Sequence, residues 1–505
     1  MPMYTLATLP LIQKLSAPSL PTTQIWYADD ATAFGYISHL RTWWDKLVSC
    51  GPFYGYYPNA SKTWLVMKEA HLQEAATLFD GTGVHITAQG RPHLGAALGT
   101  PSYVNQYVAD KVQQWATELE RLSDIAKTQP HTAYATLTHS LSSKWTFITR
   151  TVPSIGDLLQ PLEDVLRQKF IPALTGQPAP SDLVRQLPAL PARLGGIDVT
   201  NPIVCSEVEY NASQQMCRPL VDHIIQGYSS YPPDIVSEQL TAKTMNNGNK
   251  HQQQKQVALS LPSSLPSALQ RAMTLAKERG ASSWLTTLPI SEFGFALRQS
   301  AFHDALALRY GWQPLNVPTT CSCGTIDHVL SCAKGGFPFI RHNEIRNVTA
   351  TLMSEVCHDV ATEPHLQPLN GEVFPHRSAN AEDGARLDIV ASGFWGSRFE
   401  RTYYDVRVFN PYATFNHHSN RRHELLKRNA YEQQIREVEH ASFTPLMMSL
   451  TGGLGSTATP TYKHLASLLS TKWNQPHGKV MAWLRCRLSF SLLRSSIMCI
   501  TKGSS

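Results

Sequence analysis

Two pairs of aspartates in this sequence have types and spacings suited to metal chemistry. Asp29 and Asp30 are adjacent and lie between two apolar runs, whereas Asp388 and Asp405 each belong to an apolar run in the C-terminal part. Carboxylate oxygens are preferred ligands of Mg²⁺, and two of them held close together serve the metal-assisted chemistry of phosphate esters. Each pair therefore predicts a divalent-metal site, provided that the surrounding elements bring its carboxylates together.

The residues around the first pair predict a β-hairpin with the acids at its turn. Apolar residues at 25–28 lead into the pair, and a second apolar run at 31–35 leads away from it. Taken alone, two aspartates at a turn are more often solvated turn residues than metal ligands. Two further segments follow in order, Gly-Tyr-Tyr-Pro-Asn-Ala-Ser-Lys-Thr at 55–63 and His-Leu-Gly-Ala-Ala-Leu-Gly at 93–99, within the length of one small domain.

This order of segments resembles the reverse transcriptase of a non-LTR retrotransposon, from its third catalytic motif onward. The resemblance implies that Asp29 and Asp30 correspond to metal-binding acids of a polymerase palm. It also implies that 55–63 is the next palm motif, with Lys62 contacting nucleic acid, and that 93–99 is the primer grip. The fingers and the strand with the other metal-binding aspartate are absent from the sequence. We therefore expect a partial palm without unaided polymerase activity.

The second pair requires two adjacent strands. Residues 384–390 and 399–409 have strong β-strand character, and the glycine-containing turn between them predicts a hairpin. Residues two apart on a strand share a face, so Arg407 lies on the same side as Asp405. Paired carboxylates beside a cation suit metal-assisted phosphodiester hydrolysis, because the acids hold the metal and the cation offsets charge on the phosphate. The structural alternative is that Asp388 caps a turn and Asp405 forms an ion pair with a neighbouring arginine.

Four further residues have the spacing C-x-C-x4-H-x3-C: Cys321, Cys323, His328 and Cys332. Three thiolates and one imidazole match a closed, structural Zn²⁺ site of tetrahedral geometry. The alternative is a pair of buried cysteines beside a capped helix, because C-x-C is tighter than the usual C-x2-C spacing. The nine cysteines of the chain are otherwise mostly isolated, which argues against a secreted disulfide framework and for a reducing compartment.

A Cys-Cys-His-Cys knuckle, then Arg-His-Asn at 341–343, then two aspartate-bearing strands resembles the restriction-like endonuclease of site-specific non-LTR retrotransposons, a variant of the PD-(D/E)XK nucleases. The resemblance implies catalytic Mg²⁺ or Mn²⁺ held by Asp388 and Asp405. It makes Glu355 a candidate helix acid that completes the metal shell.

Arg407 stands where this family usually has lysine, and an arginine cannot act as a general base at neutral pH. The family sometimes supplies its lysine from the following helix, and the segment 423–431 looks like that helix. We therefore expect Lys427 to be the catalytic lysine.

Basic side chains near these motifs predict nucleic-acid contacts. Arg341 and His342 follow the knuckle, and Arg421 and Arg422 belong to a basic cluster that we expect to face DNA. A histidine at the start of a helix is also often a cap or a packing residue, so both interpretations of His342 stay open. The partners implied are target DNA and the RNA or RNA–DNA duplex of the element. The sequence identifies no protein partner.

We therefore expect an α/β (α+β) multidomain protein. Its parts in order would be a partial reverse transcriptase palm (1–102), a helical thumb (103–227), a linker and helical region (228–318), the zinc knuckle (319–335) and a restriction-like endonuclease domain with a mixed sheet and flanking helices (336–505). Within the third part, 243–256 is dense in Asn, Gln and Lys, which fits an exposed helix or a flexible linker. The Ser/Pro-rich stretch 259–269 is also linker-like.

Composition sets wider bounds. The 505 residues are enough for two to four domains, and 42% hydrophobic with 16% charged residues is ordinary for a folded protein. A net charge of +6 mildly favours nucleic-acid partners. We expect neither a transmembrane helix nor a signal peptide. The apolar stretch 481–500 is interrupted by arginines and predicts an amphipathic closing helix or strand.

The sequence thus favours the C-terminal part of a retrotransposon polyprotein that nicks target DNA with a divalent metal, to prime reverse transcription. Nuclear localisation follows from the resemblance. A second hypothesis is an inactive relic that binds nucleic acid without cutting it, which the truncated start and Arg407 favour. A third is that the sequence is one exon, or carries an incorrect start, of a full enzyme.

Overall fold

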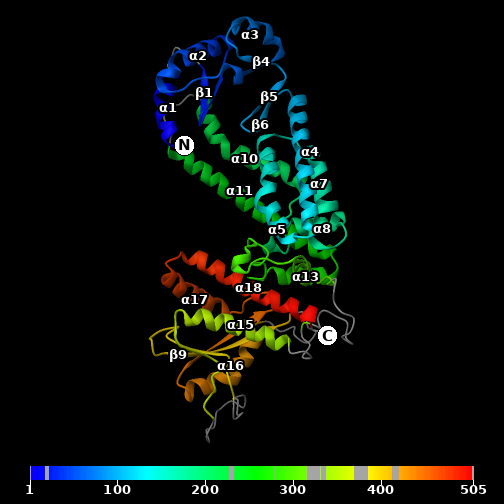
Figure 1. Cartoon of the computed structure of the whole chain (residues 1–505), viewed down its shortest axis with the longest axis vertical. Helices are drawn as coiled ribbons and strands as arrows, with labels where there is room; N and C mark the ends of the chain where they lie inside the picture. Colours follow the sequence, from blue (N-terminus) through cyan, green and yellow to red (C-terminus); the bar gives the residue numbers. More distant parts are fainter. Residues whose placement is uncertain are drawn as a thin grey trace. The chain divides into compact units, whose positions relative to one another are not determined.

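The computed structural model describes residues 2–16, 22–226, 233–278, 280–314, 330, 337–368, 385–411 and 420–502. Helices predominate in these residues, and the sheets are small, the largest being a four-stranded mixed sheet (Figure 1). The chain divides into two compact units. The first comprises Met1–Leu119, Ser140–Leu166 and Asn201–Gln252, and the second comprises Glu120–His139, Arg167–Thr200 and Gln253–Ser505.

The first unit begins with a helix, a β-hairpin and further short elements. Its elements up to residue 99 are α1 (Pro2–Leu15), β1 (Thr23–Tyr27), β2 (Asp30–Phe34), α2 (Ile37–Cys50), β3 (Trp64–Val66), α3 (Leu72–Leu78), β4 (His85–Thr87), β5 (Gly90–His93) and β6 (Ala96–Gly99). The predicted hairpin is confirmed, because β1 pairs antiparallel with β2 and the turn consists of Ala28 and Asp29. The hairpin packs against a hydrophobic core formed by buried residues of α1 and α2, among them Leu11, Leu15, Trp43, Trp44 and Leu47.

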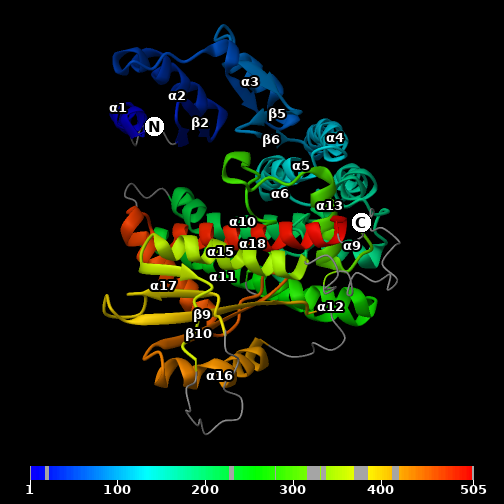
Figure 2. The same ribbon diagram turned by 60° about the horizontal axis from the view of Figure 1, so that its bottom comes forward.

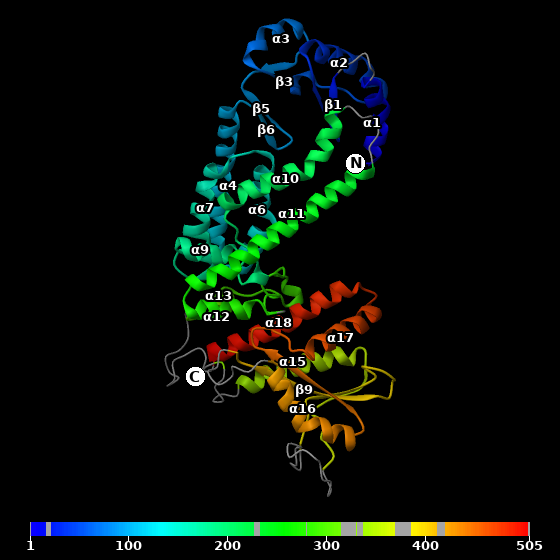
Figure 3. The ribbon, with the colours of Figure 1, turned by 180° about the vertical axis from the view of Figure 1, so that it is seen from behind.

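Helices make up the rest of the first unit. They are α4 (Pro101–Ala126) and α11 (Pro233–Ser260), both of which continue into the second unit, with α6 (Ser142–Thr151), α7 (Gln160–Val165) and α10 (Pro202–Ile225). Figure 3 shows α10 alongside α6, with which it packs. The carboxylate of Glu209 on α10 links its neighbours, since it lies 2.8 Å from Arg150 on α6 and 2.7 Å from Lys250 on α11. Residues 243–256 are therefore helical, the first of the two predicted alternatives.

The second unit has a helical part and a sheet. The helical part contains α5 (Pro130–Thr136), α8 (Ile171–Thr175), α9 (Asp182–Ala189), α12 (Ser267–Ala276) and α13 (Gln299–Tyr310). The prediction of a linker at 259–269 was wrong. Leu261 and Leu265 are only 3% and 5% exposed, so the leucines that interrupt the Ser/Pro run anchor this segment in the core.

The four-stranded sheet has the order β10-β9-β8-β7, with flanking helices. Its elements are α15 (Phe337–Ser354), β7 (His358–Thr362), β8 (Ile389–Ser392), β9 (Arg401–Phe409), α16 (Asn420–Glu437), β10 (Ser442–Ser449), α17 (Ala458–Trp473) and α18 (His477–Lys502). β7, β8 and β9 are antiparallel in succession, and β10 runs parallel to β9 after the crossover through α16. The predicted mixed sheet and the predicted β8–β9 hairpin are confirmed.

The strands β8, β9 and β10 are largely buried, whereas the edge strand β7 is mostly exposed. Along β9, the alternation of side chains decides which helix each residue contacts. Tyr404 and Val406 of β9 belong to a core with α15, α17 and α18, whereas Tyr403 belongs to a second core with Ile435 of α16. Figure 2 shows the strands between α15 on one face and α16 on the other. Because residues two apart share a face, Asp405 points with Tyr403 toward α16. Among the described residues, none of the helices combines the length and apolar character needed to span a membrane.

Candidate active site

Strand pairing brings the two predicted aspartates together. Asp388 directly precedes β8, and its N–H donates a hydrogen bond of 3.2 Å to the carbonyl of Tyr404 on β9. Asp405 is therefore the next residue beside it, in the middle of β9. The side chains of Asp388 and Asp405 are only 13% and 8% exposed. The hairpin thus holds two carboxyl groups side by side and largely out of water.

Each carboxylate has one side-chain partner from a helix, a histidine for Asp388 and a lysine for Asp405. His342, on the first turns of α15, places Nε2 2.8 Å from Oδ1 of Asp388. The other oxygen of Asp388 accepts a hydrogen bond of 2.6 Å from the backbone N–H of Val406. Lys427 of α16 places Nζ 2.7 Å from Oδ2 of Asp405. Because α15 and α16 cover opposite faces of the sheet, the pair is approached from both sides.

The electrostatics of the two carboxyl groups differ. Burial raises the pKa of Asp405 above its usual value, the nearby charge of Asp388 adds to the rise, and Lys427 offsets part of it. Burial alone would also raise the pKa of Asp388. The hydrogen bond and charge of His342, with the N–H of Val406, outweigh burial and bring that pKa below its usual value. Two carboxyl groups whose environments push their pKa values apart are typical of sites that do chemistry.

The donor set fits a hard divalent cation. Mg²⁺ is usually bound through one or two carboxylates and keeps several waters, so two adjacent aspartates suffice for it. Within the described residues, no cluster of three or more His, Cys, Asp and Glu side chains is arranged to hold a metal. The pair therefore suits a partly hydrated Mg²⁺ or Mn²⁺ ion, and a closed cage of protein ligands is not formed by the described side chains.

The structure does not bring Glu355 to this pair. Glu355 lies just beyond the end of α15, where its Oε2 accepts a hydrogen bond of 2.9 Å from Trp473 of α17. At 1.5 Å per residue, the helix separates Glu355 from His342 by about 20 Å. The same helix instead places His342, which we had expected to contact nucleic acid or to pack, against Asp388. The assignment of Glu355 to the metal shell was wrong.

The predicted basic residues divide into buried and exposed ones. Arg341 is 3% exposed and donates a hydrogen bond of 3.2 Å to the carbonyl of Leu330, which argues against a direct contact with nucleic acid. Arg407 is half-buried and shares a face of β9 with Asp405, as expected. Lys62, Arg421 and Arg422 are exposed and keep the accessibility that contact with a phosphate requires.

Asp29 and Asp30 form a more open pair in the first unit. Both are exposed at the β1–β2 turn, where the carbonyl of Asp29 accepts a hydrogen bond of 3.1 Å from the hydroxyl of Tyr56. Burial, followed by the charges of Tyr4, Asp30 and Asp29, raises the pKa of Tyr56 to about 12. No third ligand joins the two aspartates among the residues that the structure describes. The predicted zinc ligands Cys321, Cys323, His328 and Cys332 lie outside the described residues.

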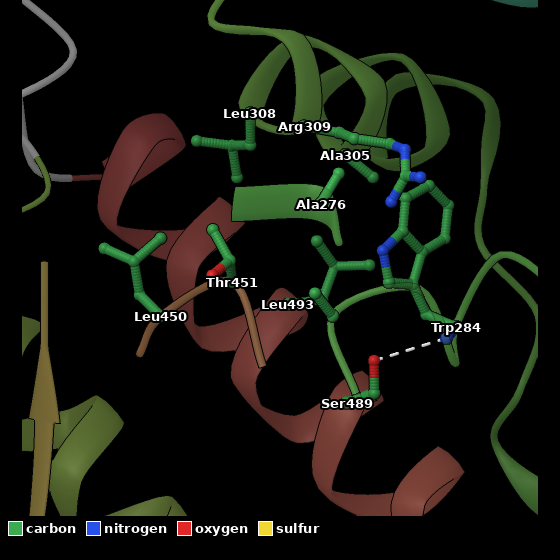
Figure 4. Close-up of a pocket in the computed structure, with 10 residues that line it drawn as sticks. Ala276, Trp284, Ala305, Leu308, Arg309, Leu450, Thr451, Ser489 and Leu493 are labelled. Atoms are coloured by element: carbon green, nitrogen blue, oxygen red, sulfur yellow. Dashed lines mark hydrogen bonds between the residues drawn. The ribbon is translucent and has the colours of Figure 1, made fainter. Parts of the chain in front are cut away.

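A small cavity lies elsewhere in the second unit, between α12, α13 and α18 (Figure 4). Its volume is about 30 Å³, enough for one or two water molecules and far too small for a nucleotide. Arg309 lines it, and its guanidinium donates hydrogen bonds of 2.9 Å to Ser282 Oγ, 2.7 Å to the carbonyl of Ala192 and 3.1 Å to that of Gly196. Arg309 therefore ties three segments together, and the cavity is part of the core.

Comparison with known proteins assigns no family to this chain, since no protein-family model matches it and a search of curated proteins finds no match. The functional argument therefore depends on the geometry of the aspartate pair and on the motifs in the sequence.

Proposed function

We propose that the chain is a divalent-metal-dependent DNA endonuclease whose active site is the pair Asp388 and Asp405 with Lys427 and His342. The observation that carries the proposal is the pair itself. Two carboxyl groups are held together against the cost of burial and mutual repulsion. Their partners outweigh that cost at Asp388 but compensate only part of it at Asp405. Perturbed carboxyl groups of this kind cluster at active sites, where a cation or a reacting phosphate completes them.

Each side chain has a distinct part in this chemistry. Asp388 and Asp405 would hold the metal, which when bound supplies Lewis acidity for hydrolysis of the phosphodiester. Lys427 places a positive charge beside Asp405, where it suits the negative charge that develops on the phosphate during hydrolysis. The cation–π contact of its Nζ with Tyr431, 5.5 Å from the ring centre, helps to orient it. His342 fixes the orientation of the Asp388 carboxylate.

DNA as substrate, and nicking that primes reverse transcription, come from the motifs that resemble site-specific non-LTR retrotransposons. The basic residues Arg421 and Arg422 on the first turn of α16 support a polyanionic substrate, because they are exposed close to Lys427 in the chain. Asp29 and Asp30 remain a proposed remnant of the polymerase palm, for which we expect no unaided activity.

A second candidate function is binding of nucleic acid without cleavage. One observation favours it: Nζ of Lys427 already lies 2.7 Å from Oδ2 of Asp405, so the ion pair must loosen before that oxygen can serve a metal. In this case the same basic surface would hold DNA, and the aspartate pair would be a relic.

Nicking of supercoiled plasmid by the purified chain separates the two functions. We expect nicks with Mg²⁺ or Mn²⁺, loss of nicking with a chelator, and loss in both Asp388→Asn and Asp405→Asn. Asp124→Asn is the matched control, because Asp124 is also paired with a lysine, Lys127 at 2.8 Å, but on the exposed surface. Absence of nicking by a folded, zinc-supplemented wild type would refute the endonuclease and favour binding without cleavage.

A further inference from the structure

A group of charged side chains lies beside the aspartate pair, where the chain after β7 runs next to the chain before β8. The N–H of Glu363 donates a hydrogen bond of 3.0 Å to the carbonyl of Asp388. Two residues further along, His365 pairs antiparallel with Arg386. Arg346 of α15 forms an ion pair with the carboxylate of Glu363. We call Arg346, Glu363, His365 and Arg386 the flanking cluster.

Alternation along these two segments places the side chains of His365 and Arg386 on the α15 side of the sheet. Their chain neighbours Leu366, Ala385 and Leu387 belong to the core on the α16 side. Because adjacent residues of an extended chain point to opposite faces, His365 and Arg386 point away from that core. Both are exposed, and residues directly opposite each other on paired strands have neighbouring side chains. A ligand from solvent can therefore reach the two together.

Helix α15 connects the flanking cluster to the active site. Arg346 follows His342 by four residues, so the two share a face of the helix about 6 Å apart along its axis. His342 contacts the carboxylate of Asp388 at 2.8 Å. Arg346 contacts Glu363, whose backbone is in turn hydrogen-bonded to that of Asp388. The cluster is thus joined to Asp388 on the α15 side through direct contacts.

The two arginines of the cluster differ in what they need from Glu363. Arg346 is 9% exposed, and its buried guanidinium requires the partners that it has, Glu363 and the amide oxygen of Asn347 at 3.1 Å. Arg386 is 54% exposed and lies 3.7 Å from Glu363, too far for a hydrogen bond. With His365 counted as neutral, two arginines and one glutamate give the cluster a net charge of +1. Among the residues that the structure describes, this excess charge lies at the accessible Arg386.

We propose that Arg386, with His365 beside it, binds a backbone phosphate of the DNA one or two nucleotides from the scissile phosphate, and thereby positions the strand on the aspartate pair. This inference rests on the proposed endonuclease and adds a substrate-binding site to it. Two residues of extended chain separate Arg386 from Asp388 by about 6.6 Å. Phosphates of one DNA strand follow each other about every 3.4 Å along the helix axis, which sets the distance of one or two nucleotides.

The chemistry of the flanking cluster suits a phosphate. A guanidinium presents paired N–H donors that match two phosphate oxygens, and a histidine ring can donate a further hydrogen bond. The half-exposed carboxylate of Glu363 is the anion that now lies nearest to Arg386, so an incoming phosphate competes with it. Contacts of this kind fix the register of a protein on DNA without reading its sequence. Arg386 is therefore a positioning residue.

DNA binding by the full chain tests Arg386 without cleavage. With a chelator present, a labelled duplex is titrated at several salt concentrations and binding is followed by fluorescence anisotropy. Arg386→Ala should weaken binding about three- to tenfold and reduce the slope of log K against log salt by about 1, because one phosphate contact is lost. Glu363→Gln removes the competing charge and keeps an acceptor for Arg346, so it should bind DNA about threefold more tightly.

Arg398→Ala is the matched control. Arg398 is also exposed, but it belongs to the β8–β9 turn, beyond the end of β8 that is farther from Asp388. Its loss should leave the salt slope unchanged, and Arg386→Lys should retain most of the wild-type slope. An unchanged slope in Arg386→Ala would overturn the inference. So would weaker binding in Glu363→Gln at an unchanged Tm, because Glu363 and Arg386 would then serve only to hold the two segments together.

The position of the contact is tested at a mapped nick. A neutral methylphosphonate that replaces the phosphate one or two nucleotides from the nick should weaken binding by the wild type as much as Arg386→Ala does. The same replacement should cause no further loss in Arg386→Ala. Additive losses would place Arg386 elsewhere on the DNA and overturn the inference. In nicking assays, Arg386→Ala should raise KM about three- to tenfold and leave kcat within about twofold.

The two proposals fail in different ways. If the wild type nicks plasmid but Arg386→Ala binds DNA with the wild-type affinity and salt slope, the endonuclease stands and the phosphate site is refuted. If Arg386→Ala reduces the salt slope but no DNA is cut with any divalent metal, the endonuclease is refuted. Arg386 is then a phosphate contact of a protein that binds DNA without cleavage, and its place beside a scissile phosphate is overturned.

Discussion

Replacement of Lys427 by methionine tests whether the buried ion pair has the strength that its geometry implies. Lys427→Met keeps most of the side-chain volume and removes the charge, which leaves Asp405 buried without its cation. Loss of one partner from a buried pair costs about 3–5 kcal/mol. Because Lys427 is 25% exposed, we expect a loss at or below the lower end of that range, about 2–3 kcal/mol, at neutral pH with a chelator present.

The reverse replacement should cost less. Asp405→Asn leaves Lys427 without its anion, but a lysine with a quarter of its surface exposed can extend toward water. We therefore expect a loss of about 1 kcal/mol for Asp405→Asn, and a double variant no less stable than Lys427→Met alone, with a coupling free energy of about 2 kcal/mol.

Thermal unfolding of the four proteins measures this cycle. For domains of ordinary size, 2–3 kcal/mol corresponds to a decrease in Tm of about 5–10 °C. The surface pair Lys127 and Asp124 is the control, and its replacement should give no measurable coupling. A Tm for Lys427→Met equal to that of the wild type, or zero coupling, would show that the ion pair is not formed in solution. Lys427→Met should also reduce nicking by about 10²-fold or more.

Three further predictions concern other parts of the chain. Burial lowers the pKa of His131 to about 4, below its value in the unfolded chain, so its contribution to stability should be present above pH 6.5 and lost as pH falls toward 4, by about 3 kcal/mol in total. Urea unfolding of wild type and His131→Gln at several pH values measures this loss. If the free energy of unfolding changes equally with pH in both proteins, the assignment is contradicted. Ala28 has a φ of 54°, so Ala28→Gly should raise the free energy of unfolding of the first unit by about 0.5–1 kcal/mol, and a decrease on chemical denaturation would argue against the left-handed turn. Glu355→Gln should leave the plasmid nicking rate within about twofold of wild type, because it retains an acceptor for Trp473 and lies far from the aspartates; a loss of 10²-fold would restore Glu355 to the metal shell.

Local patterns explain which parts of the fold were predictable. The β1–β2 and β8–β9 hairpins follow from apolar runs separated by turn residues, and such signals need no knowledge of distant segments. The adjacency of Asp388 and Asp405 follows from the same hairpin. The composition of residues 259–269 indicated a linker, but Leu261 and Leu265 are buried, and the turn Leu261–Ser264 packs against α9, which lies far earlier in the sequence.

Helix side chains at the site were harder to assign, because a helix contacts a sheet through only part of its length. Successive residues on α15 point about 100° apart. As a result, Arg341 enters the core while His342 meets Asp388, although the sequence offers both as basic residues of one motif. Glu355 has the right chemistry for a metal ligand, yet it lies beyond the end of the helix. Which of Arg341, His342 and Glu355 reaches the aspartates depends on where α15 crosses the sheet.

The site therefore depends on how two separate cores hold two helices. Buried Thr349 on α15 lies 2.8 Å from the hydroxyl of Tyr462 on α17, a contact that fixes the helix carrying His342. On the other face, Tyr403 of β9 donates a hydrogen bond of 3.0 Å to Glu439, just after the helix that carries Lys427. Since His342 and Lys427 depend on different cores, a packing defect on one face should displace one partner of the aspartate pair and leave the other in place. The hairpin supplies the acids, and the two helix contacts decide whether those acids are compensated.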